Sequence, residues 1–520
     1  MPNRNAAIYF FLTLSATILS PILLQSARGW AIGSETAVTN EHVAHQWIAQ
    51  EGWKLFNYQF GPSEIDSYVG APTEYPNGPN TGWIEGVYDE DIRGENPFKY
   101  TADANHPSLR HFWAPHTIGW ARDYDDGLYT FDSAPNMAIK YFTGGYGFKG
   151  SLDSAWGDNP SATVGQGIPQ VYSSGATGKG TAYYYFGHTI HLLGDLAVPA
   201  HSHADAHLES SWQLANDPDP VHDYVDGTTF DSNGNNGLPS ADFDDVNPTR
   251  YKMWKFQGGA VGRPGVIASM RSGDLPSPQQ VTARYNNDDW PSETMQSVPS
   301  GYNAAMLPMY ILYAETAREA AHYDTKDYNG QSDQGSRNSD YRTFDFGYYN
   351  NFTRTEIEEV ADQMVPNAMW VTAAMIRFFY SQVDSTPPGL SWRDLGAVNN
   401  PLVFPLGSGG SRSVPIELIV DEPTSGVDQD GFKYFLQKYN GSSWADLGSP
   451  RTSSISTILS SLSVGDYRVW AKVENGAGLS GESPFGYFTV AIPEPSAAML
   501  LVLGAAWMLG NSTNRRRHDK

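Results

Sequence analysis

Cysteine is absent from this 520-residue chain. Its absence excludes disulfides, thiolate metal sites and cysteine nucleophiles together. Basic residues are also scarce, because 33 lysines and arginines stand against 57 acids and leave a net charge of −24. A chain this acidic argues against broad electrostatic capture of nucleic acid. Any metal ion must therefore be held by histidine, aspartate, glutamate or main-chain groups.

The composition is nevertheless that of a folded protein. Hydrophobic residues make up 40% of the chain and aromatic residues 13%, which is enough for a sizeable core. Disordered and collagen-like classes are excluded on this ground. The length exceeds that of one ordinary domain and predicts at least two.

The N-terminal residues 1–29 have the pattern of a secretory signal peptide. Arg4 supplies a positive start, and an apolar run extends from Ala6 to Leu24. Cleavage after Gly29 would make Trp30 the new N-terminus. The alternative is an uncleaved membrane anchor, which Pro21 and the shortness of the apolar run disfavour.

The C-terminal segment 492–520 has three parts in a fixed order. Ile492-Pro493-Glu494-Pro495 precedes the apolar stretch Ala497–Gly510, and Arg515–Arg517 follow it. Fourteen apolar residues are short for a transmembrane helix, although a simple C-terminal anchor is the alternative. The order resembles the PEP-CTERM sorting signal of Gram-negative bacteria. That resemblance implies an exosortase as partner and a location in the cell envelope or extracellular matrix.

The chain between these ends changes its hydrophobic period once. Residues 30–383 show helical spacing, which predicts an all-α domain with helices near 40–56, 182–196, 307–322 and 366–380. The last of these is expected to carry Pro366 in its first turn. Residues 384–389 form a Pro/Gly linker. Residues 390–490 then follow a period of two, with strands expected around 416–420, 432–439 and 467–474, which predicts a small all-β immunoglobulin-like sandwich.

Histidines and aspartates recur at spacings that suit a metal. His191 and Asp195 are four residues apart and share one face of a helix, where an imidazole and a carboxylate can bind one divalent ion. Pro199 ends that helix, so His201 is free to point at a second position. His222 and Asp226 repeat the spacing of four. His45 and His111 lie upstream, and the whole set has the composition of a multinuclear zinc site.

The run His191-x-x-Gly194-Asp195, followed by five residues and His201, resembles the core signature of zinc-dependent phospholipase C and of the related fungal single-strand-specific zinc nucleases. The resemblance spans about Trp30 to Tyr380. It implies an all-α domain that holds three zinc ions in a cleft.

The resemblance also implies a ligand for each position of the family pattern. It assigns two residues to one zinc ion, Trp30 through its α-amino group and carbonyl oxygen, and His45. It assigns His111, His191 and Asp195 to a second ion, with Asp195 bridging to the first. The third ion is assigned His201, His222 and Asp226. Asp91 matches the acid beside the attacking water, with Asp89 as an alternative, and His42 competes with His45. His188, His203 and His207 have no family counterpart and are interpreted as neighbours of the ligands or as surface residues.

The implied activity is hydrolysis of phospholipid phosphodiester bonds at a membrane surface. Two features conflict over the substrate. Asp226 stands where the familiar phospholipases have glutamate and the nucleases aspartate, whereas the long gap between Trp30 and His45 is phospholipase-like. A single-strand-specific zinc nuclease, with nucleic acid as partner, is therefore the alternative enzyme. An envelope or matrix protein with structural zinc, whose sandwich binds polysaccharide, is the alternative of another class.

Overall fold

The computed structural model describes only part of the chain. Trp30, His42, His207, His222, Asp226 and the expected signal peptide lie outside that part, as does most of the expected sorting segment, and the side chains of Asp89 and Asp91 are not described. The described residues are 44–69, 82–92, 111, 113, 124–125, 130–131, 133–144, 166–203, 221, 224–225, 254, 275–281, 304–323, 354–407, 409–493, 502 and 504–507.

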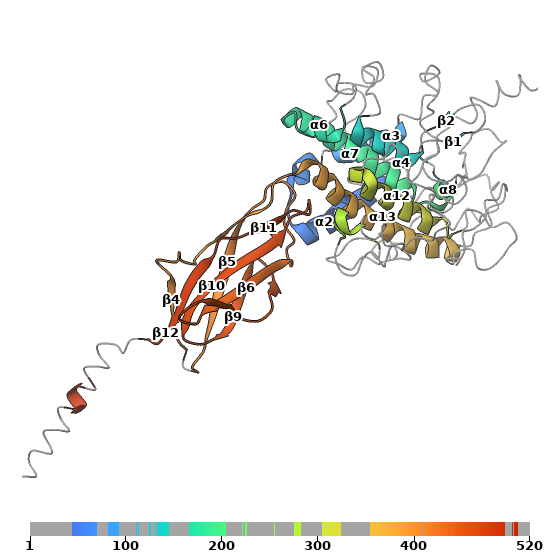
Figure 1. The fold of residues 1–520 in the computed structure, drawn as a ribbon. Coiled ribbons are helices and arrows are strands. Elements are labelled where there is room, and N and C mark those ends of the chain that lie inside the picture. Colours follow the sequence, from blue (N-terminus) through green and yellow to red (C-terminus); the bar gives the residue numbers. More distant parts are fainter. Residues whose placement is uncertain are drawn as a thin grey trace, which may run out of the picture. The chain divides into compact units, whose positions relative to one another are not determined.

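The chain divides into two compact units (Figure 1). The first comprises Met1–Thr386 with Pro423–Val427 and Gly476–Gly478, and the second Pro387–Glu422, Asp428–Asn475 and Leu479–Lys520. The first unit is helical over most of its described part, and the second is built from strands. A helical N-terminal part followed by a β-sheet part is the order that the change of hydrophobic period predicts.

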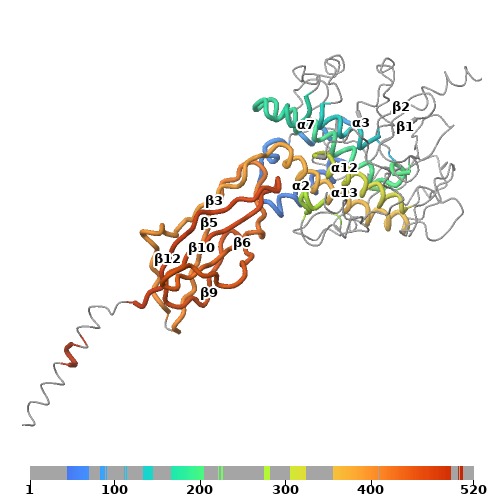
Figure 2. The backbone as a smooth tube through the Cα atoms, viewed as in Figure 1, coloured from blue at the N-terminus to red at the C-terminus, as the bar shows by residue number. Residues whose placement is uncertain are grey.

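The helical unit gathers its long helices around one core, and Figure 2 shows α2 beside α13 although they are far apart in sequence. Its described elements are α2 (Ala44–Phe60), η2 (Glu64–Tyr68), α3 (Trp83–Ile92), β1 (Tyr124–Asp125), β2 (Thr130–Phe131), α4 (Ala134–Thr143), α6 (Ile168–Tyr172), α7 (Ala176–Asp195), α8 (Pro199–Ser202), η5 (Ala304–Met306), α12 (Leu307–Ala320) and α13 (Arg354–Val383).

The expected start of the last helix is wrong. Helix α13 begins at Arg354, and Pro366 lies inside it rather than in its first turn. An internal proline costs a helix about 3 kcal/mol, because it removes one backbone hydrogen bond. The side chains of Met364, Val365 and Met369 around it are fully buried, and each contributes about 1.5–3 kcal/mol. Burial in the core therefore outweighs the local preference, which is all that the sequence pattern registers.

Helix α7 is buried along nearly its whole length. It was expected at 182–196 and is found at Ala176–Asp195, six residues longer at its start. Every residue from Gly180 to Asp195 is buried. A helix that is apolar on all sides lies inside a core, so the polar side chains His188, His191 and Asp195 near its end are buried as well.

Helices α3 and α7 cross at two glycines. A Cβ atom on Gly86 would lie 1.9 Å from the carbonyl oxygen of Tyr184, and one on Gly187 would lie 2.0 Å from that of Trp83. The two backbones therefore touch, which no other residue type permits at these positions. This close approach lets main-chain groups of α3 reach side chains of α7.

The β unit consists of two sheets. The larger has the strand order β4-β12-β10-β6-β7, with β11 paired to β10 and β8 to β6, and the smaller has the order β3-β5-β9. All pairs are antiparallel except β12 with β4, which is parallel. The strands are β3 (Gly389–Trp392), β4 (Leu402–Pro405), β5 (Arg412–Asp421), β6 (Phe432–Tyr439), β7 (Trp444–Asp446), β8 (Arg451–Ser453), β9 (Ser456–Leu462), β10 (Gly465–Glu474), β11 (Ser480–Glu482) and β12 (Gly486–Ala491).

The expected strands in this region are confirmed. Strand β6 has the predicted bounds, and 416–420 falls within β5. In β10 the alternate residues Tyr467, Val469 and Val473 are at most 1% exposed, so one face of the sheet is covered as the period of two predicts.

In the part of the chain that the structure describes, no helix combines the length and the apolar character that a membrane span requires.

Candidate metal centre

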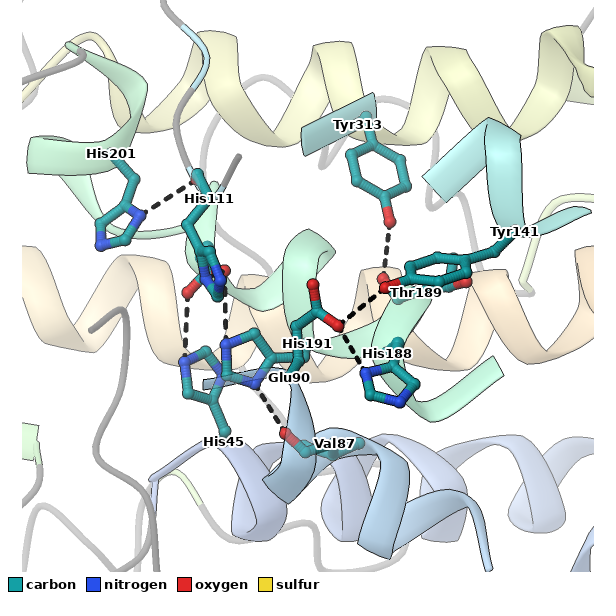
Figure 3. Close-up of polar contacts among 11 residues, drawn as sticks. His45, Val87, Glu90, His111, Tyr141, His188, Thr189, His191, His201 and Tyr313 are labelled. Carbon is teal, nitrogen blue, oxygen red and sulfur yellow. Dashed lines mark hydrogen bonds and ion pairs between the residues drawn. The ribbon is translucent and has the colours of Figure 1, made fainter. Parts of the chain in front are cut away.

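Asp195, the last residue of α7, lies at the centre of a group of three histidines. Its Oδ2 is 2.7 Å from His111 Nδ1 and 3.5 Å from His191 Nε2, and its Oδ1 is 3.2 Å from His45 Nε2. Figure 3 shows the three imidazoles converging from separate parts of the chain. All four residues are at most 4% exposed. A buried carboxylate surrounded by buried imidazoles is the composition of a metal site.

Three of these residues can hold one ion together. One ligand atom each from His45, His191 and Asp195 lies within 4.8 Å of the other two. Two ligands of one tetrahedral zinc ion stand roughly 3.4 Å apart, given bonds of about 2.1 Å. His45 Nε2 lies 3.2 Å from Asp195 Oδ1 and His191 Nε2 lies 3.5 Å from Asp195 Oδ2, so each nitrogen is near this distance from one carboxylate oxygen. The donor set of nitrogen and oxygen also suits zinc, so these residues fit the ion.

Main-chain carbonyls set the tautomers of two histidines. His191 Nδ1 lies 2.7 Å from the carbonyl oxygen of Val87, and His201 Nδ1 lies 3.1 Å from that of His111. A carbonyl only accepts hydrogen bonds, so each Nδ1 must carry the proton. The lone pair is then on Nε2, which is the arrangement found for metal-binding histidines.

The charge of Asp195 is stabilised inside the core. Burial by itself would raise the pKa of its carboxyl group. The electrostatic effect of the neighbouring imidazoles of His191 and His111, with hydrogen bonds from His111 and His45, outweighs burial and holds the pKa of Asp195 well below its usual range. The carboxylate is therefore ionised at neutral pH, as a metal ligand has to be.

His201 reaches the site through the turn after α7. Val198 is extended and Pro199 starts the short helix α8, where its missing N–H costs nothing. The carbonyl oxygen of His201 accepts a hydrogen bond from Trp113 N at 3.1 Å, and His201 Nδ1 donates to the carbonyl of His111. These two bonds tie the segment that carries His111 to α8 and place His201 beside His111 (Figure 3).

The structure thus brings together four of the eight expected ligands, His45, His111, His191 and Asp195, and sets a fifth, His201, next to them. Trp30, His222 and Asp226 lie outside the described residues. The resemblance divides His45 and His191 between two ions that share Asp195, whereas the described geometry allows both to reach one ion. Asp91 lies in α3, one turn after Val87.

Sequence reasoning missed Glu90. It lies between the two candidate acids and is fully buried, with Oε2 2.5 Å from His188 Nδ1 and 3.0 Å from the hydroxyl of Tyr141. The spacing of Trp83, Val87 and Glu90 places all three on one stripe of α3, a signal that the sequence contains. His188 is 0% exposed, so of its two expected roles the surface one is wrong.

Two further buried groups lie close to the centre. Burial, and the nearby charges of Asp195 and then Glu90, raise the pKa of Tyr313 well above its usual value, and its hydroxyl donates to the carbonyl of Thr189 at 2.6 Å. Burial also lowers the pKa of His203 to about 4, although its Nε2 donates to the carbonyl of Tyr323 at 3.0 Å. Tyr313 and His203 are therefore uncharged at neutral pH.

Comparison with known proteins gives structural neighbours only. No protein-family model matches the chain, and no curated protein matches it. One similar solved structure is the alpha-toxin of Clostridium perfringens from avian strain SWCP, at 11% identity over 88% of this chain and 100% of that one, with a TM-score of 0.25. Another is the alpha toxin from Clostridium absonum, at 11% identity over 89% of this chain and 98% of that one, with a TM-score of 0.29. TM-scores this low do not establish a shared fold.

Proposed function

We propose that the helical unit is a zinc-dependent phosphoric diester hydrolase of the phospholipase C type. The observation that carries this proposal is the convergence of His45, His111 and His191 on the buried carboxylate of Asp195. The motif His191-x-x-Gly194-Asp195 with His201 supports the reaction class, because it resembles the signature of that superfamily.

Three zinc ions are proposed. Trp30 and His45 would hold one, His111, His191 and Asp195 the second, and His201, His222 and Asp226 the third. Bound zinc supplies Lewis acidity toward a phosphoryl oxygen and makes water more acidic. Coordination positions left open for water or substrate would distinguish such a centre from structural zinc, which normally has four protein ligands.

The residues of the chain contribute orientation and proton transfer. Val87 and His111 hold the imidazoles of His191 and His201 in one tautomer through their carbonyl oxygens. Asp91 would orient the attacking water and accept its proton, in line with its place on α3 one turn from Val87. The sequence alternative Asp89 lies two residues earlier on the same helix, which is over half a turn away.

A phospholipid at a membrane surface is the proposed substrate, and a single-strand-specific zinc nuclease is the second candidate, which Asp226 favours. The test uses the purified full-length protein. Zinc content is measured by elemental analysis, and hydrolysis of phosphatidylcholine and of single-stranded DNA is compared side by side. Zinc with phosphatidylcholine hydrolysis supports the proposal, and zinc with DNA hydrolysis alone supports the nuclease. Zinc with neither activity points to structural zinc, and absence of zinc refutes all three.

We further propose that the β unit is an immunoglobulin-like sandwich. Strands β6, β10 and β12 lie side by side in one sheet and β3, β5 and β9 in the other, which is the division of strands in that fold. The hydroxyl of Tyr467, near the start of β10, donates to the carbonyl of Ser463 at 2.7 Å. A tyrosine bonded back to the chain at this corner is a further mark of the fold.

Export to the envelope or extracellular matrix is proposed from the sequence alone. Cleavage after Gly29 is part of this proposal, since it would free the α-amino group of Trp30 as a ligand. Mass spectrometry of the mature protein tests it, and active protein with residues before Trp30 would contradict it.

A further inference from the structure

Glu90, His188 and Tyr141 form a second buried cluster, called here the Glu90 clamp. One carboxylate oxygen of Glu90 lies 2.5 Å from His188 Nδ1 and accepts a hydrogen bond from the hydroxyl of Tyr141 at 3.0 Å. All three side chains are 0% exposed. They belong to α3, α7 and α4, so this single oxygen connects three helices (Figure 3).

The clamp is one helical turn from the candidate metal centre on both helices that it connects. On α7, His188 precedes His191 by three residues, and on α3, Glu90 follows Val87 by three. Residues three apart share a helix face. The contact of Glu90 with His188 and the contact of Val87 with His191 are therefore neighbouring links between the same two helices.

At the point where these helices come closest, neither one contributes a side chain. Gly86 and Gly187 meet there backbone to backbone. Helices normally keep their register because side chains of one fit between those of the other. A slide by one residue moves a helix about 1.5 Å along its axis, and this would lengthen and misalign the 2.7 Å bond between Val87 and His191. Directional hydrogen bonds near the crossing can prevent such a slide.

Stability alone does not account for this cluster. Burial of a carboxylate and an imidazole costs several kcal/mol, and well-packed apolar side chains in their place are often neutral or stabilising. Apolar burial depends weakly on direction, whereas a hydrogen bond requires a defined distance and angle. The hydrogen bonds of Glu90 to His188 and Tyr141 supply such a constraint beside the glycine crossing.

We propose that Glu90 is a positioning residue for the metal centre. By holding His188, it keeps α3 in register on α7, so that the carbonyl of Val87 stays on His191 Nδ1 and the lone pair of Nε2 faces Asp195. The inference rests on the proposed function insofar as that function requires a metal at His191.

The test compares three variants of the full chain. Glu90→Leu removes the clamp, and Glu90→Gln keeps an acceptor in the same place. Glu64→Leu is the matched control, because Glu64 also binds α7 through its carboxylate, at Lys179 and Tyr183, far from His191. Zinc affinity is measured by competition with a chelator. In the metal-free protein, the side-chain ¹⁵N shifts of His191 report its tautomer.

We expect Glu90→Leu to weaken zinc binding about 10-fold or more, the usual range for groups that orient a metal ligand, and to give His191 a mixture of tautomers. Glu90→Gln should recover most of both. Glu64→Leu should lower the melting temperature and leave the zinc affinity unchanged. If Glu90→Leu does not fold, Tyr141→Phe removes one bond of the clamp and should shift both readouts in the same direction.

Equal zinc affinities of Glu90→Leu and Glu64→Leu, or a His191 tautomer that does not change, would overturn the inference. Failure of the proposed function has a different signature. If the unmodified protein binds no zinc, that function is refuted, while the tautomer of His191 in the metal-free variants still decides the role of Glu90.

Discussion

Gly187→Ala tests whether the close crossing of α3 and α7 builds the metal centre. The added Cβ atom would lie 2.0 Å from the carbonyl oxygen of Trp83 and 2.7 Å from the backbone nitrogen of Val87. An ordinary contact begins at 3.4 Å, so the helices must separate by about 1.4 Å at this point. No rotamer change relieves the clash, because these two atoms and the third near the Cβ, Gly86 Cα at 2.8 Å, are all main-chain atoms.

The separation acts directly on His191. Its Nδ1 is 2.7 Å from the carbonyl oxygen of Val87, and a shift of about 1.4 Å takes this distance past the limit of a hydrogen bond. Alanine gains about 1 kcal/mol of helix propensity over glycine. Overpacking costs about 1–3 kcal/mol. Two buried hydrogen bonds between the helices are at risk, Val87 with His191 and Glu90 with His188, and the loss of each adds about 1 kcal/mol. The net effect is therefore destabilisation by roughly 2–4 kcal/mol.

The assay combines thermal unfolding with a zinc affinity measured by chelator competition. We expect a lower melting temperature and zinc affinity reduced about 10–100-fold, since His191 loses the carbonyl that sets its tautomer. Gly178→Ala is the matched control on the same helix, because its Cβ would meet Ser174 Oγ at 2.0 Å and the carbonyl of Val171 at 2.2 Å, away from the ligands. It should destabilise the protein without changing zinc affinity. A Gly187→Ala protein that binds zinc as tightly as the control would refute the reasoning.

Three further predictions concern single side chains. Asp195→Asn should abolish zinc binding, because it removes the charge on which three histidines converge, and zinc retained at full stoichiometry would contradict this. Burial raises the pKa of Tyr380 well above its usual value near 10. The neutral Tyr380 hydroxyl therefore contributes fully to the free energy of unfolding below about pH 10, and this contribution is lost as the pH rises further. Chemical unfolding should show that Tyr380→Phe loses less stability at alkaline pH than the unmodified protein. Equal losses in the two proteins would contradict the prediction. Phe488→Ala should destabilise the β unit by about 3–5 kcal/mol, because Phe488 is 0% exposed and stacks on Tyr467 with ring centroids 5.2 Å apart. Calorimetry measures this loss of stability, and the zinc content should not change.

The sequence by itself determined which segments form helices and which form strands, and which residue types can act as metal ligands. The period of two in β10 and the spacing of four between His191 and Asp195 are local properties, because neighbours along one strand or helix turn decide them. The absence of cysteine limited the ligands to histidine and acids in the same direct way. Element ends were less certain, as Pro366 shows, because its cost is local while the burial that offsets it comes from the rest of the core.

Only the tertiary structure decided which residues meet. His45, His111 and Asp195 are distant in sequence, and their separations of 2.7 and 3.2 Å follow from the packing of the helices. The roles of Glu90 and the carbonyl of Val87 arise where Gly86 and Gly187 let two backbones touch. A periodic pattern shows which face of a helix is buried, but it holds no information on the helix that covers that face. That information lies in the fit of two surfaces, which exists only once the chain has folded.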